Sequence, residues 1–250
     1  MEANNESVVL ITGASRGIGV GLAEGFAVPG ARLALTARRR TSLQETCRRV
    51  EALGARALPL ALDVRRLEDM PAVVDQVEDE LGPIQVLVNN AGVNIPRPAE
   101  QVTEEQWDEI LDANLKGAFF LSQEVGRRMI PRRRGTIVNV ASAAGLVARE
   151  ERAAYGSSKA GMIMLTRVLA LEWAKHGITV NAVAPTFVET DLAAQTLDRP
   201  GMREKILGQI PLRRLATVED VAASVLFLAS PQASFLTGVV IPVDGGATLR

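Results

Sequence analysis

Short apolar runs alternate with longer stretches of helical periodicity along this chain of 250 residues. A run such as Val8–Ile11 is too short for a helix and has no polar position, which is typical of a parallel strand buried on both faces. Seven strands are expected, near residues 7–12, 32–36, 57–62, 85–89, 135–141, 178–184 and 238–242, and helical patterns fill each gap. Right-handed crossovers between such units predict an α/β fold with a doubly wound parallel sheet, which is covered by helices on both faces and binds ligands at its carboxyl edge.

The first apolar run leads directly into a glycine-rich turn. Residues 12–19 read Thr-Gly-Ala-Ser-Arg-Gly-Ile-Gly, and a helical pattern follows them. Strand, glycine turn and helix are the context of a dinucleotide-binding site, because glycines let the backbone approach a pyrophosphate and a helix N-terminus offers free N–H groups. The spacing is G-x-x-x-G-x-G rather than G-x-G-x-x-G. A glycine turn without a ligand is the alternative interpretation.

A second group of polar residues lies further along the chain. Tyr155 is the only tyrosine, Lys159 follows it four positions later, and Ser142 precedes it by thirteen. Residues spaced i and i+4 share one face of a helix, so the ammonium of Lys159 is expected to lower the phenol pKa from about 10. A serine hydroxyl both donates and accepts hydrogen bonds. These residues predict a site that moves a proton to or from a substrate oxygen, with a surface pair on an amphipathic helix as the alternative.

In this order and spacing, the motifs resemble the short-chain dehydrogenase/reductase family, from Val8 to Gly246. The resemblance implies a single Rossmann-type domain over residues 1–250, a nicotinamide cofactor, and hydride transfer between an alcohol and a ketone. It rests on residues 12–19, Asn89, Asn90, Ala91, Gly92, Asn114, Ser142, Tyr155 and Lys159.

The resemblance also implies a role for each site residue. Tyr155 is then the general acid in reduction and the general base in oxidation, Lys159 also bonds the nicotinamide ribose, and Ser142 orients the reacting oxygen. The backbone carbonyl of Asn114, which interrupts a helical stretch, holds a water that connects Lys159 to solvent. The cofactor is expected to contact Gly13, Ser15, Arg16, Gly17, Ile18, Gly19, Arg38, Asp63, Val64, Asn90, Ala91, Gly92, Tyr155, Lys159, Pro185, Val188 and Thr190.

The end of the second apolar run indicates which nicotinamide cofactor binds. A site for NAD places a carboxylate here for the ribose 2′-hydroxyl. Ala37 takes that place, Arg38 follows it, and Arg16 lies within the glycine turn. Two guanidinium groups suit a 2′-phosphate, because charge-assisted and bidentate hydrogen bonds form there. The sequence therefore predicts NADP(H), with arginines that only solvate a helix start as the alternative.

Three other positions leave questions open. Asp63 is expected to reach the adenine, but a carboxylate after a strand is equally a helix N-cap. Pro185-Thr186 stands where the family usually has Pro-Gly, and a threonine resists backbone angles that a glycine permits, so the loop is expected to be reshaped. His176, the only histidine, lacks partners for a metal site or for Ser-His catalysis, so no metal is predicted.

Composition narrows the class of protein. The net charge is −1, so no basic excess indicates a nucleic-acid partner, and the three arginines at 132–134 are interpreted as solvated. The single Cys47 fits a reducing compartment. The first seven residues contain no signal region, and no apolar run approaches the ~18 residues of a membrane span. We therefore expect a soluble, cytoplasmic protein without a membrane partner.

The substrate is expected to meet three loop segments. Residues 94–101 and 143–151 form two walls, and residues 187–212 form a mobile, moderately apolar lid of small helices. The lid start resembles that of 3-oxoacyl-(acyl-carrier-protein) reductases, which favours NADPH-dependent reduction of a 3-oxoacyl thioester or another ketone. Residues 132–134 would then face an acidic carrier protein. The alternatives are a sugar-acid or polyol dehydrogenase, similar to the gluconate 5-dehydrogenase group, and a cofactor-binding protein without turnover.

The helical segment over residues 153–174 carries more apolar surface than one face of the sheet can cover. In the family, this helix and the one over 104–129 pack against a second subunit, and the carboxyl segment makes another contact. A homotetramer with D₂ symmetry is therefore expected.

Overall fold

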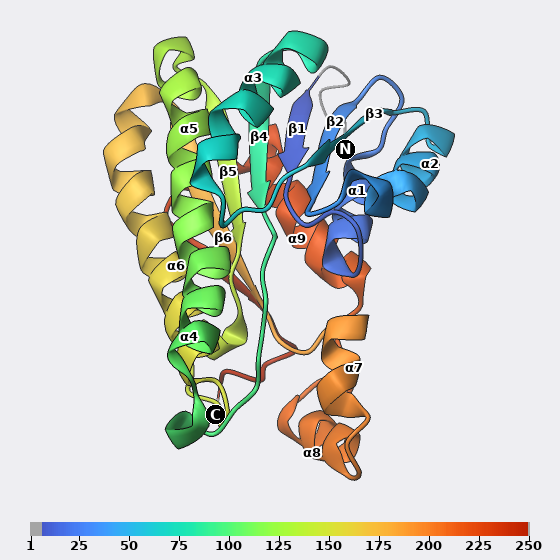
Figure 1. Cartoon of the computed structure of the whole chain (residues 1–250), viewed down its shortest axis with the longest axis vertical. Helices are drawn as coiled ribbons and strands as arrows, with labels where there is room; N and C mark the ends of the chain where they lie inside the picture. The colour runs from blue at the N-terminus through green and yellow to red at the C-terminus, as the bar shows by residue number, and fades with distance from the viewer. Residues whose placement is uncertain (1–6, 250) are drawn as a thin grey trace.

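A seven-stranded parallel sheet forms the centre of the molecule (Figure 1). The computed structural model describes residues 7–249, apart from the side chains of Asp191, Leu192 and Gln195, so residues 1–6 and 250 of the expected domain lie outside it. The expected strands all form, with ends displaced by at most two residues, and the predicted fold is confirmed. In sheet order the strands are β3 (Arg56–Ala61), β2 (Arg32–Ala37), β1 (Val8–Ile11), β4 (Ile84–Asn89), β5 (Gly135–Val140), β6 (Ile178–Pro185) and β7 (Val240–Val243).

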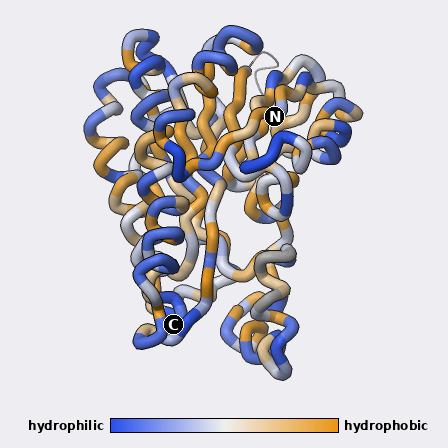
Figure 2. Tube along the Cα trace, viewed as in Figure 1, coloured by the Kyte–Doolittle hydropathy of each residue, from blue (hydrophilic) through white to orange (hydrophobic). Residues whose placement is uncertain are grey.

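Helices cover both faces of this sheet. One face carries α1 (Ile18–Phe26), α2 (Gln44–Ala52) and α9 (Val218–Ala229), and the other carries α3 (Met70–Leu81), α5 (Gly117–Arg132) and α6 (Ala153–Trp173). Along β1, Val9 and Ile11 belong to the first core, whereas Val8 and Leu10 belong to the second. A strand imposes this alternation because successive side chains point to opposite faces. Figure 2 shows apolar residues concentrated along the strands.

The helix expected over residues 104–129 contains an irregular turn. The helix α4 (Glu104–Leu111) leads into a π-helical turn at Asp112–Lys116, and α5 follows without a break. Asn114 lies inside this turn and is fully buried. A π-turn accommodates one extra residue and occurs frequently at functional sites. The interruption expected at Asn114 is therefore present, as a change of helical pitch.

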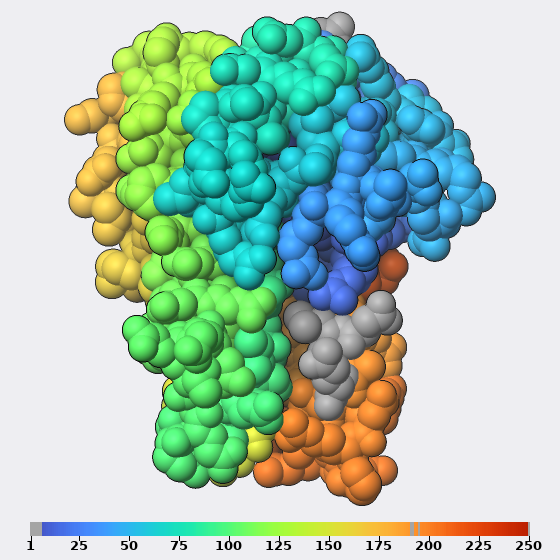
Figure 3. Space-filling model, viewed as in Figure 1, coloured from blue at the N-terminus to red at the C-terminus, as the bar shows by residue number. Residues whose placement is uncertain are grey.

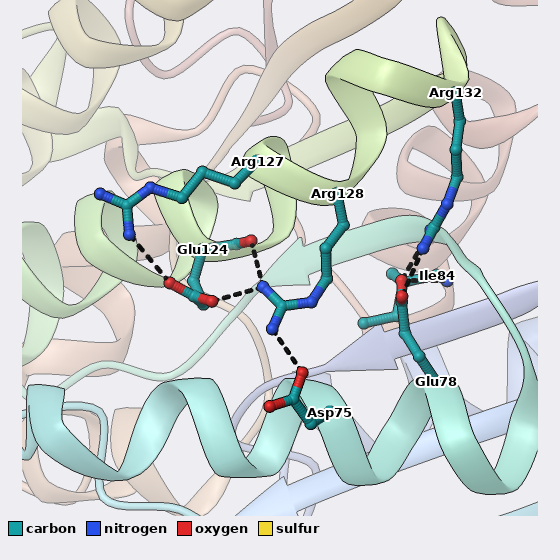
Figure 4. Close-up of polar contacts among 7 residues, drawn as sticks. All are labelled: Asp75, Glu78, Ile84, Glu124, Arg127, Arg128 and Arg132. Atoms are coloured by element: carbon teal, nitrogen blue, oxygen red, sulfur yellow. Dashed lines mark hydrogen bonds and ion pairs between the residues drawn. The ribbon is translucent and has the colours of Figure 1, made fainter.

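The arginines at the end of α5 are held by neighbouring elements. Arg132 binds the carboxylate of Glu78 through both terminal nitrogens (Figure 4). Arg133 donates to the backbone carbonyl of Lys175, with an N···O distance of 2.9 Å. All three arginines at 132–134 are nevertheless exposed, so the interpretation of this run as solvated is confirmed. Only Arg132 has a carboxylate partner among the described residues, so the basic surface expected to face a carrier protein stays a prediction.

Figure 4 shows that the same ion-pair cluster joins α3 to α5 at a second place. Arg128 bonds to Glu124 on its own helix and to Asp75 on α3. In the two pairs that cross between the helices, Arg128 and Asp75 are 21% and 62% exposed, and Arg132 and Glu78 are 36% and 16% exposed. Partly buried pairs are screened less by salt than exposed ones, so this cluster ties together two helices that cover the same face of the sheet.

Two short helices, α7 (Asp191–Leu197) and α8 (Met202–Gln209), form in the segment expected to be the lid. They extend beyond the carboxyl ends of the strands (Figure 1), and Figure 3 shows this orange segment beside the green segment that contains α4. The lid has its own apolar cluster, whose buried members include Leu197, Ile206, Ile210 and Leu215. Its helical form agrees with expectation, and its mobility stays a prediction. Among the described residues, no helix has the length and apolar character needed to cross a membrane.

Candidate active site

A cavity of about 590 Å³ lies along the carboxyl edge of the sheet. It lies where the strand order reverses, because β1 pairs with β2 on one side and with β4 on the other. Ligands of doubly wound sheets bind at this switch point, and the volume is typical of a small-molecule site. Every predicted cofactor and catalytic residue lines the cavity except Asn114.

The glycine turn leaves space for a ligand next to the backbone. Gly13 has φ 67°, and a Cβ atom added to Gly19 would lie 2.1 Å from the carbonyl oxygen of Gly13. Gly17 precedes α1, and no side chain of the described residues caps this helix. The first N–H groups of α1 and the positive end of its dipole therefore stay available to an anion, as a pyrophosphate requires. On this observation the cavity fits a dinucleotide.

Hydrogen bonds hold the two sides of the crevice together. The side-chain nitrogen of Asn90 donates to the backbone carbonyls of Thr12 (2.9 Å) and Gly13 (3.1 Å). The Thr12 hydroxyl oxygen in turn accepts from the backbone N–H groups of Asn90 and Ala91, each at 3.0 Å. The end of β4 is thus bonded directly to the start of the glycine turn.

Two exposed arginines border the cavity at the end of β2. Arg38 follows Ala37, the last residue of the strand, and Arg16 projects from the glycine turn. Neither side chain forms an ion pair with any residue that the structure describes. Among the residues described, therefore, no carboxylate lies within ion-pair distance of these two guanidinium groups, although Asp63 and Arg38 interact at longer range.

Asp63 lines the same part of the cavity but is already bonded. Arg65 donates to both carboxylate oxygens and, through its backbone N–H, to one of them. These bonds hold the pKa of Asp63 below its usual value against the opposing effect of burial. The alternative of a helix N-cap is wrong, because α3 begins only at Met70. The contact with adenine stays a prediction.

Asn114 lies behind the cavity wall rather than in it. Its side-chain oxygen accepts from the backbone N–H of Val93 (2.7 Å), and its nitrogen donates to the Val93 carbonyl (2.9 Å) and the Ser158 hydroxyl (3.1 Å). The side chain therefore fixes the loop after β4 against the first turns of α6. The predicted role of its backbone carbonyl as a water acceptor is separate from these bonds.

Ser142, Tyr155 and Lys159 meet at the centre of the cavity. Ser142 follows β5, and Tyr155 and Lys159 come from the first turns of α6. The Lys159 Nζ atom lies 5.9 Å from the centre of the Tyr155 ring and donates to the Val140 carbonyl at 2.8 Å. The predicted common face of Tyr155 and Lys159 is therefore present, and β5 supplies a partner for the ammonium.

The electrostatics of these residues differ from expectation. Burial raises the pKa of Tyr155 above its ordinary value, although the Ser142 hydroxyl and the Arg152 guanidinium partly oppose this. Burial likewise lowers the pKa of Lys159 to about 8. Burial therefore outweighs the cations near the phenol, among which Arg152 opposes it, and the effect of Lys159 on the phenol pKa stays a prediction.

The Pro185-Thr186 pair causes no backbone strain. Among the described non-glycine residues, only Arg133, Glu151 and Arg213 have positive φ. Thr186 therefore does not need the freedom of a glycine, and its backbone N–H continues the β6–β7 pairing by donating to the Val243 carbonyl at 3.2 Å. Reshaping of this loop relative to the Pro-Gly form stays a prediction, and Pro185, Val188 and Thr190 all line the cavity.

Charged residues line the substrate half of the cavity, where a moderately apolar surface was expected. Apolar side chains do fill the lid interior, but the lid turns polar side chains toward the opposite wall. Three contacts link the wall to the lid: Glu151 to Arg199 at 3.1 Å, Glu150 to Lys205 at 3.8 Å, and Arg149 to Gln209 at 3.0 Å. The run Arg-Glu-Glu-Arg just before Tyr155 was the available signal, but a run of charges is equally typical of a solvated loop.

Comparison with known proteins identifies the family. A family model described as enoyl-(acyl carrier protein) reductase matches residues 13–248. A 3-oxoacyl-(acyl-carrier-protein) reductase from Vibrio cholerae serotype O1 is 40% identical, over 96% of this chain and 96% of its own. A gluconate 5-dehydrogenase from Gluconobacter oxydans is 37% identical, over 96% of this chain and 94% of its own. The chain belongs to the short-chain dehydrogenase/reductase family.

A solved structure of another short-chain dehydrogenase/reductase agrees with this assignment. The enzyme is a short-chain type dehydrogenase/reductase from Mycobacterium marinum, 34% identical, with a TM-score of 0.93 over 98% of this chain and 96% of that one. As a short-chain dehydrogenase/reductase, the protein is an oxidoreductase that acts on CH–OH groups with a nicotinamide cofactor.

Burial of Lys159 predicts a stability that depends on pH. Folding lowers the pKa of Lys159 from 10.5 to about 8, because burial disfavours the charged ammonium. Above pH 10.5 the side chain is neutral in both the folded and the unfolded protein, so the folded protein has its full stability. As the pH falls through 8 the buried side chain takes up a proton, and that stability is lost. At pH 7 the free energy of unfolding of the Lys159→Met variant is therefore expected to exceed that of the wild type by about 1–3 kcal/mol. This range allows for the hydrogen bond to the Val140 carbonyl that the variant loses. Denaturant titration of cofactor-free protein at fixed concentration measures the difference.

The difference between the two proteins should shrink as the pH rises from 8 toward 10. Lys175→Met, at an exposed lysine near the end of α6, is the matched control and should show no such trend. A difference between Lys159→Met and the wild type that stays constant with pH would show that burial of the charge is not its cause.

Proposed function

We propose that the protein is an NADP(H)-dependent oxidoreductase that interconverts a ketone and a secondary alcohol. The observation that carries the proposal is the convergence of Ser142, Tyr155 and Lys159 in one cavity with the uncapped N-terminus of α1 and two arginines without ion pairs. A protein that only binds a cofactor has no need of this proton-transfer group.

The residues act on the substrate oxygen. When bound, the nicotinamide exchanges a hydride with the substrate carbon. The Ser142 hydroxyl holds the substrate oxygen beside the phenol of Tyr155. Tyr155 donates a proton to this oxygen during reduction and removes it during oxidation. The Lys159 ammonium, held by the Val140 carbonyl, supplies positive charge behind the phenol when it loses its proton.

Replacement of the proposed acid tests this mechanism. Tyr155→Phe keeps the ring and its packing but removes the proton, so kcat should fall about 10²–10⁴-fold while the Kd for NADPH stays within about threefold. Steady-state kinetics and fluorescence titration measure the two quantities. Turnover within about tenfold of the wild type would rule out Tyr155 as the acid.

The preference for NADP(H) is proposed from Arg38 and Arg16. Both guanidinium groups are exposed at the cavity edge next to Ala37, where an NAD site would have a carboxylate. A charge-assisted hydrogen bond contributes about 1.5–3 kcal/mol, so two of them produce a clear preference for the 2′-phosphate.

Arg38→Asp is expected to lower the ratio of kcat/KM with NADPH to that with NADH by about 10–100-fold. The new carboxylate repels the phosphate and can accept from a 2′-hydroxyl. Arg40→Asp makes the same charge change two residues further on, at a position that does not line the cavity, and should change the ratio less than about threefold. Equal effects of the two variants would contradict a direct role for Arg38.

The substrate class has two candidates. The V. cholerae relative supports a 3-oxoacyl thioester, and kcat/KM for acetoacetyl-CoA with NADPH tests this directly. The pair with Glu78 offsets the charge of Arg132, whereas Arg133 and Arg134 are exposed and could still meet an acidic carrier protein. The charged substrate half of the cavity supports the second candidate, a sugar-acid or polyol substrate like that named for the G. oxydans relative.

Assembly as a homotetramer is proposed from the outer face of α6. Met164, Val168 and Leu171 on this helix are 56%, 43% and 83% exposed, and Phe235 before β7 is fully exposed. Exposed apolar patches of this kind mark protein–protein contacts. Light scattering after size exclusion is expected to give the mass of four chains, and a monomer at micromolar concentration would contradict the proposal.

A further inference from the structure

Positive side chains outnumber carboxylates in the substrate half of the cavity. The positive residues are Arg149 and Arg152 from the loop before α6, and Arg199 and Lys205 from the lid, whereas the carboxylates there are Glu150 and Glu151. Both carboxylates lie within ion-pair distance of the lid cations, and among the described residues neither of the two remaining arginines forms an ion pair, although the Glu151 carboxylate acts on Arg152 at longer range.

The two remaining arginines differ in what they contact. Arg149 donates to the Gln209 side chain at 3.0 Å and to the Ala247 backbone carbonyl at 3.3 Å, so neutral oxygens fix its guanidinium across the cavity. Arg152 donates only to the backbone carbonyl of Glu151, at 3.1 Å. Within the described residues, Arg152 forms no ion pair although it is half-buried. A guanidinium in this setting is poorly compensated, because burial removes water without supplying an anion.

The position of Arg152 connects it to the reaction centre. It is the residue directly before α6 and lies three positions before Tyr155 in the chain, and both residues line the cavity. Its charge acts on the Tyr155 phenol directly. The backbone is also fixed there, because residue 152 bridges to residue 97 and the Arg97 N–H donates to the Glu151 carbonyl at 3.3 Å.

A second observation points to a polar ligand in the same place. The side-chain oxygen of Asn94 is buried and has no hydrogen-bond partner, and Asn94 lines the cavity. A buried polar atom without a partner is costly and uncommon in native proteins. A hydroxyl group on the substrate would satisfy it.

We propose that Arg152 binds an oxyanion of the substrate, so that the natural substrate pair is an anionic keto acid and its hydroxy acid. The inference rests on the proposed oxidoreductase function and specifies its substrate. The oxyanion itself is unchanged in the reaction: the carbonyl carbon gains the hydride of NADPH, which leaves as NADP⁺, and the carbonyl oxygen gains the proton of Tyr155. A planar carboxylate suits the two parallel N–H groups of a guanidinium, and a sulfonate has the same charge.

Matched neutral and anionic ketones test the inference. The probes are acetoacetate, ethyl acetoacetate and 2-oxopropane-1-sulfonate, each reduced with NADPH by the wild type, Arg152→Gln and Arg97→Gln. The wild type is expected to prefer an anionic probe over the ester by about tenfold or more in kcat/KM. Comparison of the two anions then distinguishes a carboxylate from a sulfonate.

Arg152→Gln should lower kcat/KM for the preferred anion by about 10–100-fold, mainly by raising KM, and leave the ester within about threefold. Arg97→Gln removes the same charge at the exposed residue that bridges to Arg152 but does not line the cavity. It should leave kcat/KM for the anion and for the ester within about threefold of the wild-type values. If Arg152→Gln does not fold, the contrast between anion and ester in the wild type still decides the matter.

The outcomes separate this inference from the proposed function. Equal reduction of anion and ester by the wild type, with a ratio unchanged in Arg152→Gln, overturns the oxyanion site and leaves the oxidoreductase intact. If the wild type reduces none of the probes, the oxidoreductase proposal loses support, and the oxyanion site is then tested by anion binding alone. Acetoacetate or the sulfonate should then raise the Tm of the wild type with NADP⁺ but not that of Arg152→Gln. An equal effect on both proteins, or none on either, overturns the inference.

Discussion

The bonds between Thr12 and Asn90 fix the geometry on which the whole site depends. They join the ends of β1 and β4 at the one place where the order of strands reverses, and there the helices on the two faces diverge. The glycine turn extends from one of these ends and the Val93 loop from the other. Because Asn114 ties that loop to α6, the glycine turn and α6 are held relative to each other through a short series of hydrogen bonds that are buried or part-buried.

Tyr155 and Lys159, the proposed catalytic residues, combine this rigidity with unfavourable solvation. Lys159 and Tyr155 are both shifted toward their neutral forms by burial, which is the opposite of what proton transfer through a phenolate requires. The cavity therefore combines a fixed geometry with two groups that burial holds toward their neutral forms. Active sites commonly retain such locally unfavourable interactions because the surrounding fold supplies the stability.

The sequence predicted the features that depend on local pattern. It did not predict which side chains from distant parts of the chain contact each other. A continuous apolar run indicates a strand that is buried on both faces of the sheet, so the ends of the strands could be predicted to within two residues. The positions of Ser142, Tyr155 and Lys159 follow from strand ends and helical spacing. In contrast, nothing in the sequence indicates that Arg132 meets Glu78, or that Arg152 turns inward while Arg97 turns outward. Those outcomes depend on the distance between elements far apart in the chain and on side-chain direction.

The π-helical turn at Asp112–Lys116 has a consequence for how this helix can vary in length. An α-helix rotates by about 100° per residue, so loss of the extra residue would turn all of α5 by that angle relative to α4. Leu121, Val125 and Met129, which are fully buried, would then leave the core, and Gly126 would no longer face the Trp173 ring. Substitutions along this helix can be absorbed one at a time, but a single insertion or deletion alters every later contact at once.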